Sequence, residues 1–241
     1  MILLAIETST KQLGVAILRD ATPLSSFEAH GTSYPHAAEL PGAVTRVLQE
    51  ARVTLKQVEA IAVDIGPGSF TGLRIGLAFV KALTFAKKTA VIGVPSLDVL
   101  ASGISFATKP ICPILDAKQK NVYAALYSVG GSASLKQADY FLGPIEEFLV
   151  RVKGPTIFLG EGCALYSAQI EKQLGNKAQF APQELWLPRA VILGRLGYER
   201  LCAGLHDDPS SLAPLYLYPL DCSVRGPDRP TAVLPKTAAA A

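Results

Sequence analysis

One stretch of the sequence restricts the fold more than any other, because an apolar run, a glycine-rich turn and a long helix follow one another directly. Val58–Ile65 is almost wholly apolar, as in a strand that is covered on both faces. Gly66-Pro67-Gly68 ends that strand, and Ser69 can cap a helix that we predict to run to about Lys87. A buried strand that leads into a helix is typical of an α/β protein.

The elements around this stretch give the order β-β-β-α-β-α. Short strands are expected at Ile2–Ile6, Leu13–Arg19 and about Pro23–Ala29. The spacing of apolar residues predicts a helix over about His36–Arg52. After the long helix, a short strand at 91–94 should lead into a helix near 96–104.

The second half of the chain repeats this pattern. When Asp116 is placed on Glu7, residues 114–122 follow residues 5–13 as strand, carboxylate, polar turn and strand. Thr156–Leu159 and its glycine turn mimic the earlier buried strand. A chance match of polar turns between strands is the competing explanation.

Two similar lobes built from β-β-β-α-β-α units are therefore predicted. The expected parts are an N-terminal lobe at 1–105, a smaller lobe at 106–218 with a closing helix at 189–205 and an extended segment at 212–217, and a flexible tail at 219–241.

Composition narrows the class of protein. The four cysteines are widely spaced and form no C-x-x-C pair, so we expect a reduced, cytoplasmic protein. The net charge of +3 disfavours tight binding of RNA by this chain alone.

No apolar run reaches the ~20 residues of a membrane span. With 49% apolar and only 18% charged residues, a partner interface is expected to cover excess apolar surface.

The turn between the first two strands gathers one carboxylate and three hydroxyls, at Glu7, Thr8, Ser9 and Thr10. Such a turn can hold a metal-bound phosphate. It can equally be an ordinary polar hairpin whose hydroxyls bond to their own backbone. These four residues are the candidate cofactor-binding loop. No catalytic or metal-binding residue is assigned, because the three histidines lack a metal-binding spacing and no Gly-x-Ser-x-Gly motif is present.

The helix that follows Ser69 is apolar on two faces. Such a helix must be covered twice, once by its own sheet and once by something else. Gly72 and Gly76 leave a smooth patch for the close approach of another helix. We predict a partner surface here, with the chain's own elements as the alternative cover. The predicted surface consists of His36, Leu40, Val44, Val47, Phe70, Leu73, Arg74, Leu77, Val80 and Lys81.

Three stretches together resemble the TsaB (YeaZ) family: Leu3–Thr10, Ala62–Gly76, and Ile114–Lys118 with Val122-Tyr123. The resemblance implies the actin-like ATPase fold of sugar kinases, heat-shock ATPases and ribonuclease H. It also implies a cytoplasmic role in placing threonylcarbamoyl on the adenosine beside the anticodon of tRNAs that read codons beginning with A.

The resemblance further implies partners. In this family's system the related protein TsaD performs the transfer, TsaE supplies an ATPase, and TsaB binds TsaD through its N-terminal helices. The chain is thus expected to be a non-catalytic scaffold that reaches tRNA only within the complex and has no cofactor of its own. The sequence leaves open whether ATP or ADP binds at the partner interface and whether the free chain is a homodimer or a monomer. The alternative is a small-molecule kinase, an ATPase or a metallopeptidase-like enzyme that uses the Glu7–Thr10 loop.

Comparison with the catalytic relative argues against a metal site. TsaD-like proteins carry a metal-binding His-x-x-x-His after the strand at 91–94. Here Ser96 and Leu100 stand at the two histidine positions, and a leucine cannot coordinate a metal.

Overall fold

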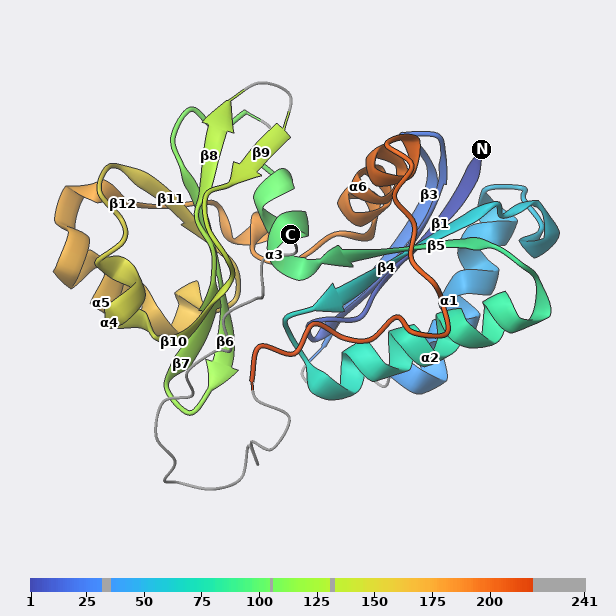
Figure 1. Ribbon diagram of the computed structural model, residues 1–241, viewed down its shortest axis with the longest axis horizontal. Helices are drawn as coiled ribbons and strands as arrows, with labels where there is room; N and C mark the ends of the chain where they lie inside the picture. The colour runs from blue at the N-terminus through green and yellow to red at the C-terminus, as the bar shows by residue number, and fades with distance from the viewer. Residues whose placement is uncertain (32–35, 105, 131–132, 219–241) are drawn as a thin grey trace, which may run out of the picture.

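The computed structural model describes residues 1–31, 36–104, 106–130 and 133–218. They form two lobes, each built around its own sheet (Figure 1). The predicted flexible tail at 219–241 lies outside the described residues. No helix within the described ranges is long and apolar enough to cross a membrane.

The first sheet has the strand order β3-β2-β1-β4-β5. The first three strands form an antiparallel meander, whereas β4 and β5 run parallel to β1. The bounds are β1 (Ile2–Glu7), β2 (Gln12–Arg19), β3 (Thr22–His30), β4 (Ala60–Gly66) and β5 (Ala90–Pro95). Every strand predicted in this half is present, with ends shifted by at most two residues.

The second sheet repeats this order as β10-β7-β6-β11-β12, with an added β8-β9 hairpin on β6. Strand β6 corresponds to β1, so Asp116 and Glu7 occupy like positions near the ends of the two central strands. The bounds are β6 (Ile111–Lys118), β7 (Asn121–Ala124), β8 (Tyr127–Gly130), β9 (Ala133–Lys136), β10 (Phe141–Pro144), β11 (Thr156–Leu159) and β12 (Ala178–Phe180). The predicted duplicated actin-like α/β fold is confirmed.

Helices cover both faces of the first sheet (Figure 1). Helices α1 and α2 lie on one face, and α6 lies on the other. Helices α4 and α5 pack in the second lobe. The bounds are α1 (His36–Glu50), α2 (Phe70–Ala86), α3 (Ser96–Ser102), α4 (Ile145–Leu149), α5 (Cys163–Leu174) and α6 (Ala190–Cys202), with 3-10 turns at Leu55–Gln57, Gly175–Lys177 and Gln183–Leu185.

The closing helix α6 returns from the second lobe to the first. It packs on β1, β2, β4 and β5. Gly194 and Gly197 permit the contact, because a Cβ at either position would clash with Leu18 or Ala62. A boundary at 105/106 therefore separates the two sheets, but the first lobe is completed by residues from the second part of the chain.

Helix α3 lies between the two lobes and links them. Its Asp98 Oδ1 accepts hydrogen bonds from the hydroxyls of Tyr127, at 2.6 Å, and Tyr140, at 2.8 Å. Burial, and then the charge of Asp98, raise the pKa of both tyrosines, so the hydroxyls keep their protons. The acceptor on α3 thus ties the first lobe to the second.

After α6 the chain forms an irregular strap at 203–218 that runs beside α2 toward the second lobe (Figure 1). The Leu215 N–H donates to the Ile65 carbonyl at 2.7 Å. The Tyr218 hydroxyl donates to the Ala117 carbonyl at 3.0 Å. The segment predicted as extended at 212–217 has no regular strand, and it links β4 of one lobe to β6 of the other.

Candidate partner interface

The turn between β1 and β2 is closed. Glu7 and Thr8 are fully buried, and Ser9 and Thr10 are 1% and 3% exposed. The Ser9 N–H and hydroxyl both donate to Glu7 Oε1 at 2.6 Å. A phosphate could reach these groups only if the turn opened, and the cofactor-binding role of Glu7–Thr10 stays a prediction.

The glycines at the start of α2 explain the closure. A Cβ at Gly68 would clash with the Ser9 carbonyl, and a Cβ at Gly72 or Gly76 would clash with Thr8. The Ser69 N–H donates to the Ser9 carbonyl at 2.6 Å, while the Ser69 hydroxyl caps the helix by accepting from the Gly72 N–H. The smooth patch was predicted to receive a partner helix, but the chain's own turn occupies it.

The two positions of the relatives' metal-binding histidines are also buried. The Ser96 hydroxyl donates to Asp64 Oδ1 at 2.6 Å, and Leu100 lies in the core between the lobes. No group of three or more His, Cys, Asp or Glu side chains that could hold a metal ion occurs in the described part of the chain.

Six of the ten residues predicted for the partner surface lie inside the first lobe. They are at most 4% exposed, because α1 and α2 turn them toward the sheet and toward each other. A partner cannot reach these side chains in the folded chain, so their assignment to a docking surface is wrong. The six are Leu40, Val44, Val47, Leu73, Leu77 and Val80.

The other four predicted residues are accessible. His36 Nε2 lies 3.3 Å from the Gln12 carbonyl oxygen. Phe70 is 53% exposed, and the Arg74 guanidinium stacks over its ring at 3.7 Å. Arg74 Nε also donates to the Tyr216 hydroxyl, and Lys81 donates to the Ser210 carbonyl. Arg74 and Lys81 therefore hold the strap against α2.

Between exposed charged residues such as Arg46 and Arg74, the outer sides of α1 and α2 also present residues that were not predicted for the partner surface. They are small or uncharged, and on the helices they lie opposite the buried leucines and valines. We call the following set the docking face: Ala38, Gly42, Thr45 and Gln49 of α1, and Thr71, Ala78, Ala82 and Phe85 of α2. Phe85 is 96% exposed. A lack of charge at helical spacing was the only signal in the sequence that could have found this face.

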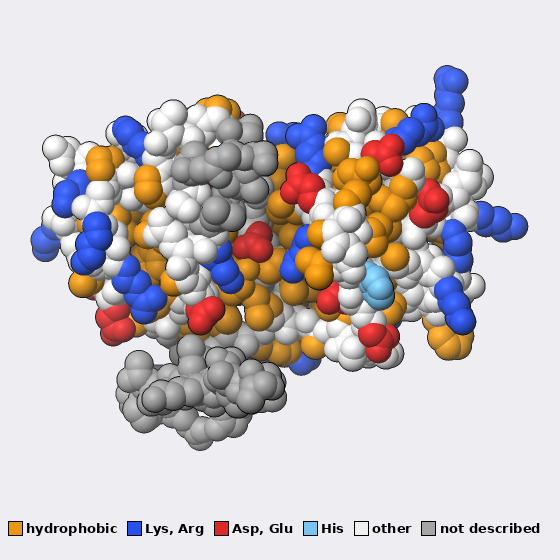
Figure 2. Space-filling model, turned by 45° about the horizontal axis from the view of Figure 1, so that its top comes forward, with side chains coloured by type: hydrophobic (Ala, Val, Ile, Leu, Met, Phe, Trp, Pro, Cys, Tyr) orange, Lys and Arg blue, Asp and Glu red, His pale blue; other side chains and the backbone are white. Residues whose placement is uncertain are grey.

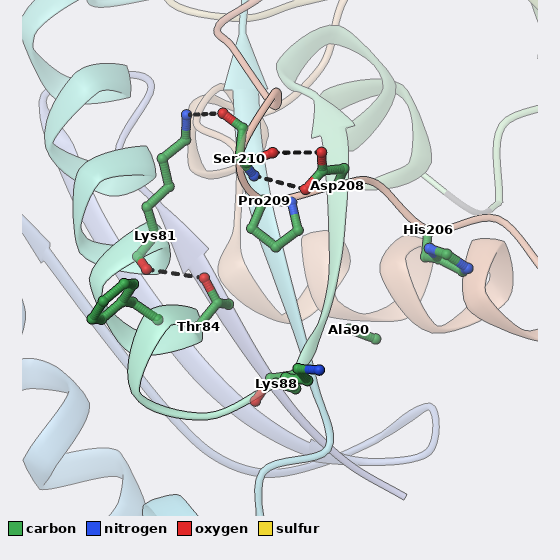
Figure 3. A pocket seen from close by; sticks show the side chains of 10 residues that line it. Lys81, Thr84, Lys88, Ala90, His206, Asp208, Pro209 and Ser210 are labelled. Carbon is green, nitrogen blue, oxygen red and sulfur yellow. Dashed lines mark hydrogen bonds between the residues drawn. The ribbon is translucent and has the colours of Figure 1, made fainter.

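Beside Phe85 the strap and the last turns of α2 line an open pocket of about 610 Å³ (Figure 3). Three of its polar residues are linked by hydrogen bonds. Lys81 reaches the Ser210 carbonyl, and the Asp208 carboxylate accepts from the Ser210 N–H and hydroxyl. These bonds lower the pKa of Asp208. The pocket extends the edge of the docking face with apolar side chains such as Phe85 and Pro209.

Charged side chains do not gather into one basic tract on the face shown in Figure 2. Lys and Arg are scattered over both lobes and alternate with Asp and Glu. This distribution agrees with the net charge of +3. A single-sign surface of the kind that grips a phosphate backbone is not visible from this side.

The repeated sheet order and the helices between and around the sheets define an actin-like α/β protein. Residues 30–218 match the family model described as TsaD, tRNA N6-adenosine threonylcarbamoyltransferase. The chain is 32% identical to the tRNA threonylcarbamoyladenosine biosynthesis protein TsaB of Bacillus subtilis, over 90% of this chain and 94% of that protein. It is 30% identical to TsaB of Escherichia coli, over 67% of this chain and 72% of that protein.

A solved structure described as YeaZ from Pseudomonas aeruginosa superimposes with a TM-score of 0.77 at 28% identity. The match covers 90% of this chain and 99% of that chain. The chain belongs to the TsaB family of tRNA threonylcarbamoyladenosine biosynthesis proteins.

Proposed function

We propose that this chain is the non-catalytic subunit of a tRNA threonylcarbamoyltransferase complex and that it docks on the transferase, TsaD, through the docking face of α1 and α2. The modification concerned is threonylcarbamoyl on the adenosine adjacent to the anticodon, in tRNAs that read codons beginning with A. Membership of the TsaB family supports this role.

The composition of the docking face is the observation that carries the proposal. The docking face exposes alanine, glycine, threonine, glutamine and one phenylalanine. Exposed charges lie beside it on α1, where Arg46 pairs with Glu50 at 2.8 Å and its guanidinium lies over the ring of Phe27 at 5.0 Å. Uncharged side chains with a charged rim have the composition of an interaction site.

The fold relation between this chain and the transferase suggests how the two meet. The match to the transferase family includes both α1 and α2, so the partner is expected to present a similar helix pair. Small residues such as Gly42, Ala78 and Ala82 let helix axes approach to ~8–10 Å. Phe85 supplies a large apolar anchor at the end of the contact.

A non-catalytic role is supported by the closed Glu7–Thr10 turn and by the serine and leucine at the two histidine positions. The enzyme alternative would require that turn to open. Five further points stay predictions of this proposal. They are binding of the ATPase TsaE, a homodimer through the docking face, ATP or ADP at the interface, contact with tRNA only inside the complex, and a cytoplasmic location.

Titration calorimetry against purified TsaD tests the docking face with a matched pair of substitutions. Ala82→Glu places a charge on the face, where docking would bury it unpaired. Ala168→Glu places the same charge on the exposed side of α5 in the other lobe. We expect Ala82→Glu to weaken binding at least tenfold and Ala168→Glu to leave the affinity unchanged.

Circular dichroism should show both variants folded, because both alanines are exposed in the free chain. Wild-type affinity in Ala82→Glu, or equal losses in the two variants, would overturn the proposed interface. Sedimentation of the free chain with and without Ala82→Glu shows whether a homodimer uses the same face.

A further inference from the structure

Two carboxylic acids meet in the middle of the first lobe, at the ends of β1 and β4. Parallel pairing places Ile6 beside Val63, so Glu7 and Asp64 follow at the same level of the sheet. Both side chains are fully buried. Neither forms an ion pair with a cationic side chain in the described ranges.

In each carboxyl group, only one of the two oxygens accepts hydrogen bonds. Glu7 Oε1 accepts the two hydrogen bonds from Ser9. Asp64 Oδ1 accepts from the Gly66 N–H and from the Ser96 hydroxyl, both at 2.6 Å. The other two oxygens, Glu7 Oε2 and Asp64 Oδ2, are buried and have no partner among the described residues. Buried acceptors in native proteins nearly always have a hydrogen-bond partner.

We propose that Glu7 and Asp64 share a single buried proton, held between Glu7 Oε2 and Asp64 Oδ2, and that this proton keeps the β1–β2 turn closed against α2. Protonation converts Glu7 Oε2 into a donor, and Asp64 Oδ2 is then its acceptor. One proton thereby satisfies both oxygens. It also removes the repulsion that two buried carboxylates in contact would feel.

The electrostatic surroundings agree with this arrangement. The pKa of Glu7 is raised well above 4.5, first by burial and then by the charge of Asp64. Burial also raises the pKa of Asp64. The groups that face the pair are the hydroxyls of Ser9 and Ser96 and the Gly66 N–H, and each carboxyl is the other's titratable neighbour. No cation from the strands and helices around them is among the causes of either shift.

The direction of the pH effect follows from the raised pKa. In the unfolded chain the two carboxyls lose their protons near their ordinary pKa values, 4.5 and 3.8. The folded chain keeps the proton at higher pH, so the stabilisation is complete below those values. It is lost as the pH rises through the raised pKa of the pair, and within that window each pH unit increases the unfolding equilibrium constant about tenfold.

Urea unfolding of the full chain between pH 5 and 9 tests the shared proton. Glu7→Gln and Asp64→Asn each replace the proton by an amide N–H that cannot titrate, with nearly the same shape. We expect each single variant to stay folded and to lose the part of the pH slope that the pair contributes. Glu184→Gln, an exposed carboxylate in the second lobe, is the matched control and should keep the wild-type slope.

The double variant separates one shared proton from other arrangements. In Glu7→Gln/Asp64→Asn two amide donors face each other with no acceptor, so its urea midpoint should fall below both single variants at every pH. Three results would overturn the proposal: an unchanged pH slope in the single variants, a double variant as stable as the singles, or single variants that do not fold. A rise of the wild-type midpoint in Mg²⁺ or Ca²⁺ that both single variants lack would show that the pair holds a cation instead.

Discussion

Three glycines at the start of α2, Gly68, Gly72 and Gly76, bring the helix into contact with Thr8 and Ser9. Each lacks the Cβ that would strike the turn, and the hydrogen bond from the Ser69 N–H to the Ser9 carbonyl fixes the distance. A β-turn that in this fold could face a ligand is thereby sealed by the protein's own helix.

The effect of a single methyl group can be measured at these positions. Gly72→Ala places a Cβ against the Thr8 carbonyl oxygen, and we expect it to lower the free energy of unfolding by about 3 kcal/mol. Gly42→Ala is the control, since nothing lies within 4 Å of a Cβ there, and the better helix propensity of alanine should raise stability by ~0.5–1 kcal/mol. Equal stabilities of the two variants in urea unfolding would contradict the account of the closed turn.

The sequence indicates that these glycines are in close contact with a neighbour, but it does not identify that neighbour. The i, i+4 spacing of Gly72 and Gly76 indicates that something approaches closely. It does not say whether that is a partner helix or a turn about 65 residues earlier in the chain, since this depends on how β1 and β4 pair. The carboxylate of Glu7 was likewise recognised, whereas its contact with Asp64 exists only in the sheet.

At the scale of elements, the hydrophobic pattern predicts the ends of α2 well, but it predicts only in part which side of the helix is buried. The sequence predicts a helix over 69–87, and the structure has one at Phe70–Ala86. Leu73, Leu77 and Val80, which the sequence predicts to lie on the partner surface, form the face that is buried on the sheet. The outer face was not identified, because alanines such as Ala78 are ordinary helix formers and give no sequence signal.

The same charge should change the stability of the protein greatly at one position of α2 and hardly at all at the neighbouring position. Leu77→Glu buries a carboxylate in the core of the first lobe and is expected to cost more than 4 kcal/mol, enough to unfold many domains. Ala78→Glu lies on the exposed side and should change the free energy of unfolding by at most ~0.5 kcal/mol. Thermal unfolding checks both, and a folded Leu77→Glu with an unchanged midpoint would contradict the assigned orientation of α2.

At the scale of the whole molecule, the two lobes depend on each other. Helix α6 covers the face of the first sheet that carries Leu3, Ala5 and Leu18, although it follows the last strand of the second sheet in the chain. Its sequence predicts a helix at 189–205 but not the sheet on which it packs, because an amphipathic helix fits many apolar faces. Asp98, with its two tyrosine partners, adds a second tie between the lobes.

A fragment that ends at residue 105 should therefore not fold by itself. Without α6, the apolar face of the first sheet is open to water. We expect residues 1–105 to show poor dispersion in amide NMR spectra and to aggregate. A peptide of residues 188–205 added in trans should restore dispersion, whereas a well-dispersed spectrum of the fragment alone would contradict the dependence of the first lobe on α6.

The non-catalytic docking role is tested most directly by formation of threonylcarbamoyladenosine on tRNA in a reconstituted mixture of TsaD, TsaE and this chain. We expect product formation to fall at least tenfold when this chain is omitted or replaced by Ala82→Glu, and Ala168→Glu to support the full rate. Full product formation without this chain, or product formed by this chain in the absence of TsaD, would contradict this role.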